Sequence, residues 1–285
     1  MIRAPKHMIR AFPLALPLAT ALALALATVL TAGGSLAQSL NFSGGDAPIE
    51  VFADNGIEWQ QDRLVFVARG NARAVRGEVT VYADELRAYY RENAGGNTDI
   101  WRLDAIGKVR IKSPDGTAYG AQGVYNVDDG ILVLSGGKQV KLVTPTDLIT
   151  AERQLEYWEK RQMAVARGNA MAKRQDRELR AEVLAAYFKR GKSGANELHR
   201  VEAFDEVKVI TQNDTAISKR GVYNVDSGIA TLSGDVRILR DGSTLKGCSA
   251  EVNLNTGISR LHTCKSDANG GTNRVRGVLR PRKNP

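Results

Sequence analysis

The sequence predicts an all-β protein: a repetitive antiparallel β-jellyroll, or roll, that is open at its ends. Three observations predict it. Short segments alternate apolar and polar residues with a period of two, Gly-containing polar turns separate them, and the chain repeats itself at an offset of 98 residues. Together they indicate a stack of strands with an apolar interior rather than two independent globular domains.

The repeat is visible by inspection. The motif Val-Ala-Arg-Gly-Asn-Ala occurs at residues 67–72 and again, unchanged, at 165–170. Residues 123–136 recur at 221–234 with 11 of 14 identities. Both pairs have the same offset, and a shorter unit of about thirty residues recurs within each copy. We therefore expect about seven stacked units, the last of them truncated.

These units define the expected domain organisation. A single extended jellyroll is predicted over residues 48–266, with its two copies at about 49–146 and 147–244. Residues 178–188 resemble a helix when taken alone. Their repeat partner contains Val-Thr-Val-Tyr at 79–82, which is typical of a strand, so both copies are predicted to be strands.

The individual strands show alternation. The clearest of them are residues 107–112, 139–142, 206–209 and 235–238. In each, Val, Ile or Leu alternates with charged or amide residues, as in a half-buried strand. The repeated Val-Ala-Arg-Gly-Asn-Ala motif is interpreted as a strand that reaches a Gly bend, although ligand contact by Arg69 and Arg167 is the alternative.

The two ends of the chain differ in composition from its middle. Residues 1–37 have a basic start, an apolar run over 11–32 and small residues before Ala37, which predicts a signal peptide cleaved after Ala37. An uncleaved transmembrane anchor is the alternative. Residues 38–47 are predicted to be a linker and residues 267–285 a basic, flexible tail that is solvated or touches phosphates or an anionic membrane.

The charge distribution argues against a nucleic-acid-binding protein. The chain has 40 Lys and Arg, 31 Asp and Glu, and a net charge of +9. Three of those charges lie in residues 1–37 and five in residues 268–285, which contain no acidic residue. The residues between them are close to neutral, so a basic folded face for nucleic acid is not expected.

No catalytic or metal-binding motif is present, so we expect neither an enzyme nor a cofactor. Asp128 and Asp129 belong to an Asp-Gly turn, and a calcium site there would need further spaced carboxylates. Enzymes that hydrolyse glycans use a pair of carboxylates. The acidic residues of this chain lie mainly in predicted turns or on charged strand faces, so the sequence identifies no such pair.

Cys248 and Cys264 are the only cysteines. In an exported protein the expected state is a disulfide, which here would close a loop of about 16 residues in the last unit. The alternative is a soft metal site with Cys248, Cys264 and His262, for which no fourth ligand stands out.

The repeated motifs resemble the OstA-like domain family. They are Gly-Asn-Ala at 70–72, Ala-Asp-Glu-Leu-x-x-Tyr-Tyr at 83–90, Gly-x-Val-x-Ile at 107–111 and Tyr-Asn-Val-Asp-Asp-Gly-Ile-x-x-Leu-Ser-Gly at 125–136. The resemblance covers roughly residues 48–262. It implies a V-shaped jellyroll in the periplasm that carries the lipid A acyl chains of lipopolysaccharide from the inner to the outer membrane.

The resemblance also implies partners and surfaces. The partners are an inner-membrane-anchored component, an outer-membrane component and further copies joined head to tail. Edge contacts are expected at Ile49, Val51, Ile258 and Leu261. The apolar residues expected to face the lipid groove are Val65, Val67, Val79, Val81, Val109, Ile111, Val140, Leu142, Val207, Val209, Val236 and Ile238. The alternative function is an envelope assembly protein that uses its sheet edges only for protein contacts.

Overall fold

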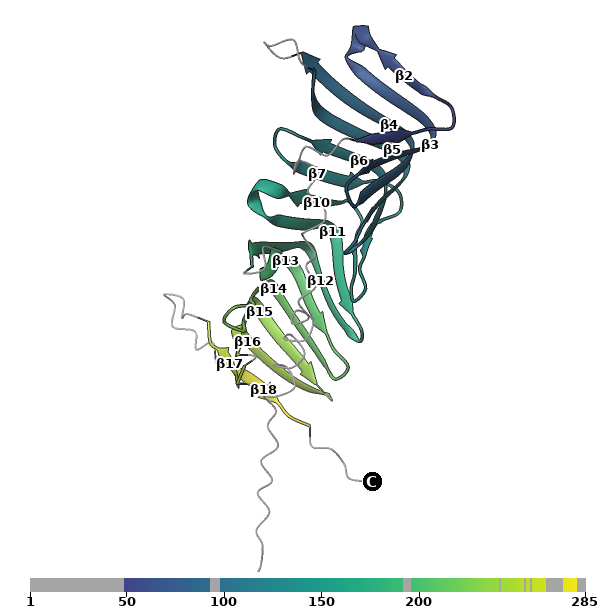
Figure 1. Cartoon of the computed structure of the whole chain (residues 1–285). Helices are drawn as coiled ribbons and strands as arrows, with labels where there is room; N and C mark the ends of the chain where they lie inside the picture. The colour runs from purple at the N-terminus through teal and green to yellow at the C-terminus, as the bar shows by residue number, and fades with distance from the viewer. Residues whose placement is uncertain are drawn as a thin grey trace, which may run out of the picture.

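The computed structural model describes residues 49–280 apart from 93–97, 192–195, 241, 254, 257 and 265–273. The described chain is a series of strands with two one-turn 3-10 helices, Gln61–Arg63 and Glu159–Arg161 (Figure 1). These short helices lie 98 residues apart, as the repeat requires. The described residues contain no helix long and apolar enough to cross a membrane.

The strands are β1 (Glu50–Phe52), β2 (Ile57–Gln60), β3 (Val65–Arg76), β4 (Val79–Glu92), β5 (Thr98–Ser113), β6 (Gly116–Asn126), β7 (Ile131–Ser135), β8 (Val140–Val143), β9 (Leu148–Ala151), β10 (Gln154–Trp158), β11 (Met163–Arg174), β12 (Arg177–Arg190), β13 (Asn196–Ile210), β14 (Asp214–Asn224), β15 (Ile229–Arg240), β16 (Ser243–Asn253), β17 (Ile258–His262) and β18 (Arg276–Val278). Every pairing is antiparallel. The predicted all-β fold is confirmed.

The strands form two sheets that meet along a line of bulges, which we call the vertex. The long strands β3–β6 and β11–β16 each pass through the vertex and contribute one half to each sheet, because their register shifts part-way along. The first sheet also contains β2, β7, β10 and β17, and the second sheet β1, β8, β9 and β18.

The Val-Ala-Arg-Gly-Asn-Ala motif forms the bulge. In β11, Gly168 and Asn169 both have positive φ, at 86° and 43°. A side chain at Gly168 would bring its Cβ to 2.9 Å from the backbone nitrogen of Arg153. Only glycine therefore fits this crossing, and the same holds for the first copy, where Gly70 has φ 77° and faces Asn55.

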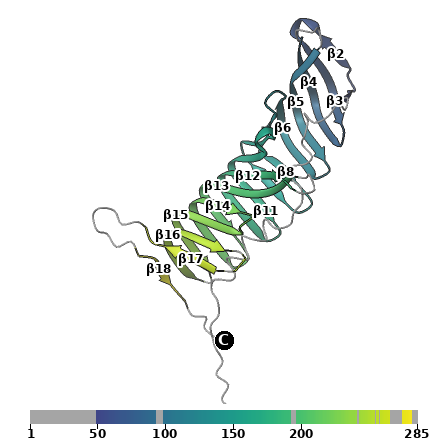
Figure 2. The same ribbon diagram turned by 60° about the vertical axis from the view of Figure 1, so that its left-hand side comes forward.

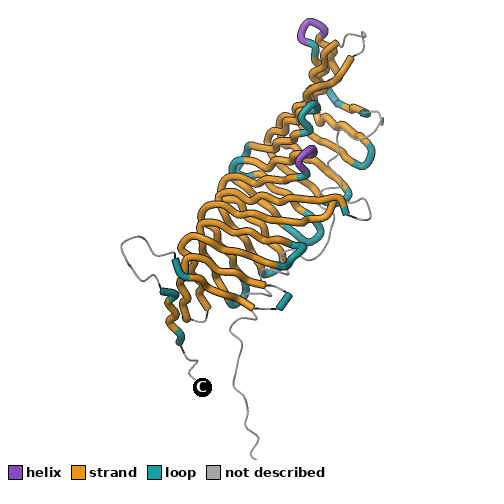
Figure 3. Tube along the Cα trace, turned by 90° about the vertical axis from the view of Figure 1, so that its left-hand side faces the viewer, coloured by secondary structure: helices purple, strands orange, loops and turns teal. Residues whose placement is uncertain are grey.

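The core lies between the inner faces of the two sheets. Beside the vertex it is completely closed, since Ala72, Val140, Ala170 and Val236 are 0% exposed. The stack is elongated and curved, with β2 and β3 at one end and β17 and β18 at the other (Figure 2). Successive strands run across the long axis of the stack (Figure 3).

Only one of the two expectations about the ends of the chain falls on described residues. The predicted signal peptide and linker lie outside the described residues. The prediction of a flexible tail over 267–285 is wrong for residues 276–278, because β18 pairs with β16 through Arg276, Gly277 and Val278. A short basic segment was not recognised as a strand because its partner strand is supplied by tertiary structure.

Candidate functional site

Three apolar cavities follow one another between the sheets, and together we call them the lumen. They have volumes of about 240, 190 and 30 Å³ from the N-terminal end onwards. The first and second share Ile111 and Leu132 in their walls, and the second and third share Leu179 and Val201. The lumen is therefore continuous in its lining and narrows toward the C-terminal strands.

Both sheets line the lumen. The residues of the first sheet that face the first cavity include Ile57, Phe66, Ala68, Leu86, Leu103 and Tyr125. The second sheet contributes Val51, Ala74, Val81 and Ile111. Opposed residues therefore come from the two halves of the same long strands, which the vertex folds over one another.

Large and small residues alternate over parts of the inner row of the first sheet, which leaves volume beside the small residues. One inner row of the first sheet reads Ile57, Ala68, Leu86, Ala105, Gly123, Leu134, Leu155, Ala166, Leu184, Ala203, Gly221, Leu232, Ala250 and Leu261. A strand that places Ala or Gly in this row leaves volume that its neighbour's Leu only partly fills.

The lumen closes toward its C-terminal end. There Val236 and Ala250 are 0% exposed and Val252 is 2% exposed, within a separate packed cluster. Its N-terminal end is open and apolar: the side chains of Ile57 and Trp59 are 52% and 59% exposed. The lumen is therefore closed by packed side chains at the C-terminal end and open at the N-terminal end.

At the open end Trp59 is held in place. Its indole nitrogen donates a hydrogen bond to the Tyr90 hydroxyl at 2.7 Å, and its ring stacks on Phe66 with centroids 5.2 Å apart. At the 98-residue offset Trp59 corresponds to Tyr157, which lines the second cavity. Trp158 is the next residue along β10, and its indole nitrogen donates to Glu156 at 2.8 Å on the opposite face of the strand.

The predicted groove residues occupy different positions. Val81, Ile111, Leu142, Val207 and Val209 line the lumen. Val109, Val140 and Val236 are buried beside the vertex, Val79 is buried at the β3–β4 hairpin, and Ile238 lies in the packed C-terminal cluster.

Val65 and Val67 require a correction. They alternate along β3 with Phe66 and Ala68, which face the first cavity, so their side chains point to the opposite face of the strand. They are nevertheless only 4% and 2% exposed. They are apolar because they are buried on the outer face, so the sequence alone does not distinguish them from residues that line the lumen.

The lining residues that the sequence reasoning missed include several leucines and isoleucines and a set of aromatic or small residues: Phe66, Ala68, Ala105, Gly123, Tyr125, Tyr157, Ala166 and Phe188. One signal was available. Ala68 and Ala166 are equivalent at the 98-residue offset, as are Leu86 and Leu184, so the large-small alternation is repeated.

The predicted edge residues have different surroundings. Ile49 and Val51 line the first cavity, although they are 36% and 39% exposed. Ile258 is 50% exposed on β17, whereas Leu261 packs against the C-terminal cluster. Each end also has a second edge strand that was not predicted, β2 at one end and β18 at the other.

The outer face of the first sheet contains several ion pairs. Glu156 is 5% exposed at its side chain and accepts hydrogen bonds from Arg167, Gln154 and Trp158. Burial alone would raise the pKa of Glu156, but these three donors outweigh it and hold the pKa below its ordinary value. Arg69 pairs in the same way with Glu85 at 3.0 Å. Both motif arginines thus have carboxylate partners.

The turn carboxylates have cation partners as well. Asp128 accepts two hydrogen bonds from Arg91, at 2.8 and 2.9 Å, which lower the pKa of Asp128. Within the described ranges, no three His, Cys, Asp or Glu side chains converge as a metal site would require.

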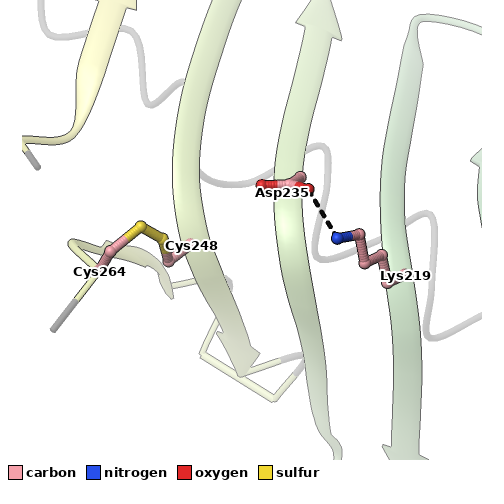
Figure 4. The surroundings of a disulfide bond; sticks show 4 residues. All are labelled: Lys219, Asp235, Cys248 and Cys264. Atoms are coloured by element: carbon pink, nitrogen blue, oxygen red, sulfur yellow. Dashed lines mark ion pairs between the residues drawn. A yellow bond between two sulfur atoms is a disulfide. The ribbon is translucent and has the colours of Figure 1, made fainter. Parts of the chain in front are cut away.

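Cys248 and Cys264 form a disulfide with their Cα atoms 5.0 Å apart, next to the Lys219–Asp235 ion pair (Figure 4).

A family model described as "LptA/(LptD N-terminal domain) LPS transport protein" matches the chain twice, over residues 50–154 and 148–258. The two matches span well over half of the 285 residues. The chain belongs to this family. The two matches to the LptA/LptD N-terminal domain family follow the two copies of the repeat, and the predicted relationship to OstA-like proteins is confirmed. The protein is therefore related to lipopolysaccharide transport.

Two individual proteins are also similar. An uncharacterized protein of Rhizobium meliloti (strain 1021) is 31% identical over 113 residues, which are 38% of this chain and 60% of that relative. The match thus spans less than two thirds of the relative. The second is LptH from Pseudomonas aeruginosa, whose crystal structure is described as that of the LptA-homologous periplasmic component of a lipopolysaccharide transport device. Its sequence is 12% identical to this chain. The comparison covers 84% of this chain and 99% of LptH with a TM-score of 0.21.

Proposed function

We propose that this protein binds lipopolysaccharide in the periplasm and carries its acyl chains in the lumen from the inner toward the outer membrane. The observation that supports the proposal is the lumen itself: three apolar cavities in series that are lined by both sheets and open at the N-terminal end. Membership of a lipopolysaccharide transport family supplies the class of ligand.

The energetics of lipid transfer explain why such a lumen is useful. Exposing one methylene to water costs about 0.8 kcal/mol, so a twelve-carbon chain costs about 10 kcal/mol. A lipid with several such chains would cross an aqueous compartment extremely slowly. A lumen walled by Leu, Ile, Ala and Tyr replaces water around the chains and requires no covalent step.

The ends of the stack support a role in a bridge. Because a sheet edge presents unpaired backbone donors and acceptors, the strands β1 and β2 of one molecule are suited to pair with β17 and β18 of the next. This contact would join two different surfaces, so it would propagate head to tail. We infer the same kind of contact with the inner-membrane-anchored and outer-membrane components.

Photocrosslinking tests the lumen. A benzoylphenylalanine in place of Phe66 or Tyr125 lies in the wall of the first cavity, whereas one in place of the exposed Gln122, which precedes the lining residue Gly123, lies on an outer face. In Gram-negative cells we expect lipopolysaccharide adducts at the first two positions and none at Gln122. The proposal is wrong if Phe66 and Tyr125 capture no lipopolysaccharide or if Gln122 captures as much.

A second candidate function is an envelope assembly protein that uses only its sheet edges. The exposed apolar end formed by Ile57 and Trp59 favours it, because such surfaces mark protein contacts. The same crosslinking separates the two functions. Head-to-tail association without lipid at Phe66 or Tyr125 would leave assembly as the better description.

A further inference from the structure

We propose that the outer face of the second sheet binds a linear anionic polysaccharide. The surface is one row of residues that runs across every strand of that sheet and that we call the basic row. It consists of Phe52, Arg73, Tyr82, Arg110, Tyr119, Lys141, Thr150, Met171, Arg180, Lys208, Ile217, Arg237, Lys246 and Arg276. Eight of these fourteen residues are Arg or Lys, and none is acidic.

The basic row is separate from the lumen. Arg73 precedes Ala74 and Arg110 precedes Ile111 along their strands, and both Ala74 and Ile111 line the first cavity. Because successive side chains of a strand point to opposite faces, the cations lie on the outside of the wall whose inside faces the lumen. The row is therefore not a further part of the acyl-chain site.

Most cations of the basic row make no ion pair with a described residue. In the part of the chain that the structure describes, Arg180 pairs with Glu178 and none of the other seven has a carboxylate within salt-bridge distance. On the outer face of the first sheet, by contrast, Arg167 and Arg220 each pair with a buried glutamate. One sheet neutralises its charges and the other leaves them available.

The near-neutral composition of the folded region concealed this segregation. Residues that are far apart in sequence, such as Arg180, Lys208 and Arg237, are brought into one row by strand pairing. The last member, Arg276, comes from the basic tail, because β18 adds its strand to this sheet. A row of like charges costs some stability through repulsion, which a bound polyanion would relieve.

The spacing and shape of the row favour a flexible linear polymer. Neighbouring strands lie about 4.8 Å apart, so Arg237, Lys246 and Arg276 present one charge per strand, comparable to one charge per sugar unit of an extended acidic glycan. The sheet turns by roughly 20° from strand to strand, so the row follows a curved path along the stack (Figures 2 and 3). A flexible chain follows such a path, whereas a flat membrane touches only part of it.

The aromatic residues of the row do not form a platform for nucleic-acid bases. Arg73 lies over the Phe52 ring at 4.2 Å, Arg110 over Tyr82 at 4.2 Å, and the Lys141 amine over Tyr119 at 4.6 Å. One face of each ring is therefore covered by a cation. Single-stranded nucleic acids bind through rings that are free to stack, so these rings are better described as supports that hold the cations in place.

The test uses the full-length mature protein and immobilised polygalacturonate, which has a carboxylate on each sugar. The variant K208Q/R237Q/K246Q removes three exposed, unpaired cations of the row. The matched control K138Q/R190Q/R260Q removes three exposed cations elsewhere. We expect the row variant to weaken binding by about tenfold or more and to reduce its salt dependence, and the control by less than about twofold.

Three further probes make the proposal specific: neutral dextran, a poly-dT oligonucleotide and vesicles that contain phosphatidylglycerol. The proposal requires polygalacturonate to bind best of the four. It is overturned if the control variant weakens binding as much as the row variant, or if dextran binds equally. Tighter binding of the oligonucleotide or of the vesicles would overturn it in favour of a nucleic-acid or membrane surface. Unchanged thermal unfolding of both variants excludes misfolding as the cause.

Discussion

Arg174 donates two hydrogen bonds to Asp147 at the edge of the second sheet, Nε to Oδ1 at 2.6 Å and Nη2 to Oδ2 at 2.7 Å. Both side chains are only 11% exposed, and both residues contribute to the wall of the second cavity. Arg240 and Asp214 make the same bidentate contact farther along the stack. In both cases the aspartate ends a turn that begins at a threonine, Thr144 or Thr211.

Breaking one of these buried pairs should be costly. We expect Asp147→Ala to lower the free energy of unfolding by about 3 kcal/mol, because the Arg174 guanidinium would remain buried without its bidentate carboxylate partner. Urea unfolding of the purified protein measures the change. Asp84→Ala is the control: in its ion pair with Lys108 the side chains are 51% and 86% exposed, so the loss of this pair should cost less than about 1 kcal/mol. Equal losses in the two variants would contradict the argument.

Acid should destabilise the protein partly through Glu156. The pKa of this carboxyl is lowered in the folded protein, so its contribution to stability is complete above the unfolded pKa of about 4.3 and is lost as pH falls through the lower folded value. We expect Glu156→Gln to flatten the dependence of unfolding free energy on pH below about pH 5. Glu251 lies in the same outer row, one strand from Arg260, but makes no ion pair within the described residues. A profile that flattens as much in Glu251→Gln would refute the assignment.

The disulfide should stabilise the C-terminal end of the stack. Cys248 lies at the vertex in β16 and Cys264 follows β17, so the bond fixes an edge strand that has a neighbour on one side only. For a loop of 16 residues the loss of the bond should cost about 3 kcal/mol. Hydrogen exchange of the C248S/C264S variant should accelerate first in β17 and only later in β3. Mass spectrometry that finds two free thiols in the exported protein would contradict the bond.

The two ends of the stack should associate with each other rather than each with its own kind. Ile57→Lys places a charge at the open N-terminal end and Ile258→Lys places one at β17, where the isoleucines are 52% and 50% exposed. Each variant alone should sediment as a monomer at concentrations at which the unmodified protein forms longer species. A mixture of the two should form dimers, because each supplies the end that the other lacks. A variant that still forms dimers by itself would show that like ends pair.

Much of the architecture was present in the sequence. The period-two alternation and the Gly-containing turns depend on local geometry, and together with the 98-residue repeat they predicted the strands and the antiparallel stack. The motif at residues 67–72 and 165–170 also indicated the bend, because Gly168 must adopt a positive φ there. Such features are readable because they are set by a few consecutive residues.

Tertiary structure alone decided which residues line the lumen and which lie outside it. Val65 and Val67 have the same alternation as true lining residues. Their orientation depends on the register of β3 against β2 and β4, and a shift of one residue exchanges the two faces. The basic row has the same origin: Arg73 and Arg276 are separated by most of the chain and share a face only because each strand pairs in one register with the next. Alternation determined that this protein would have two faces, and pairing determined what each face holds.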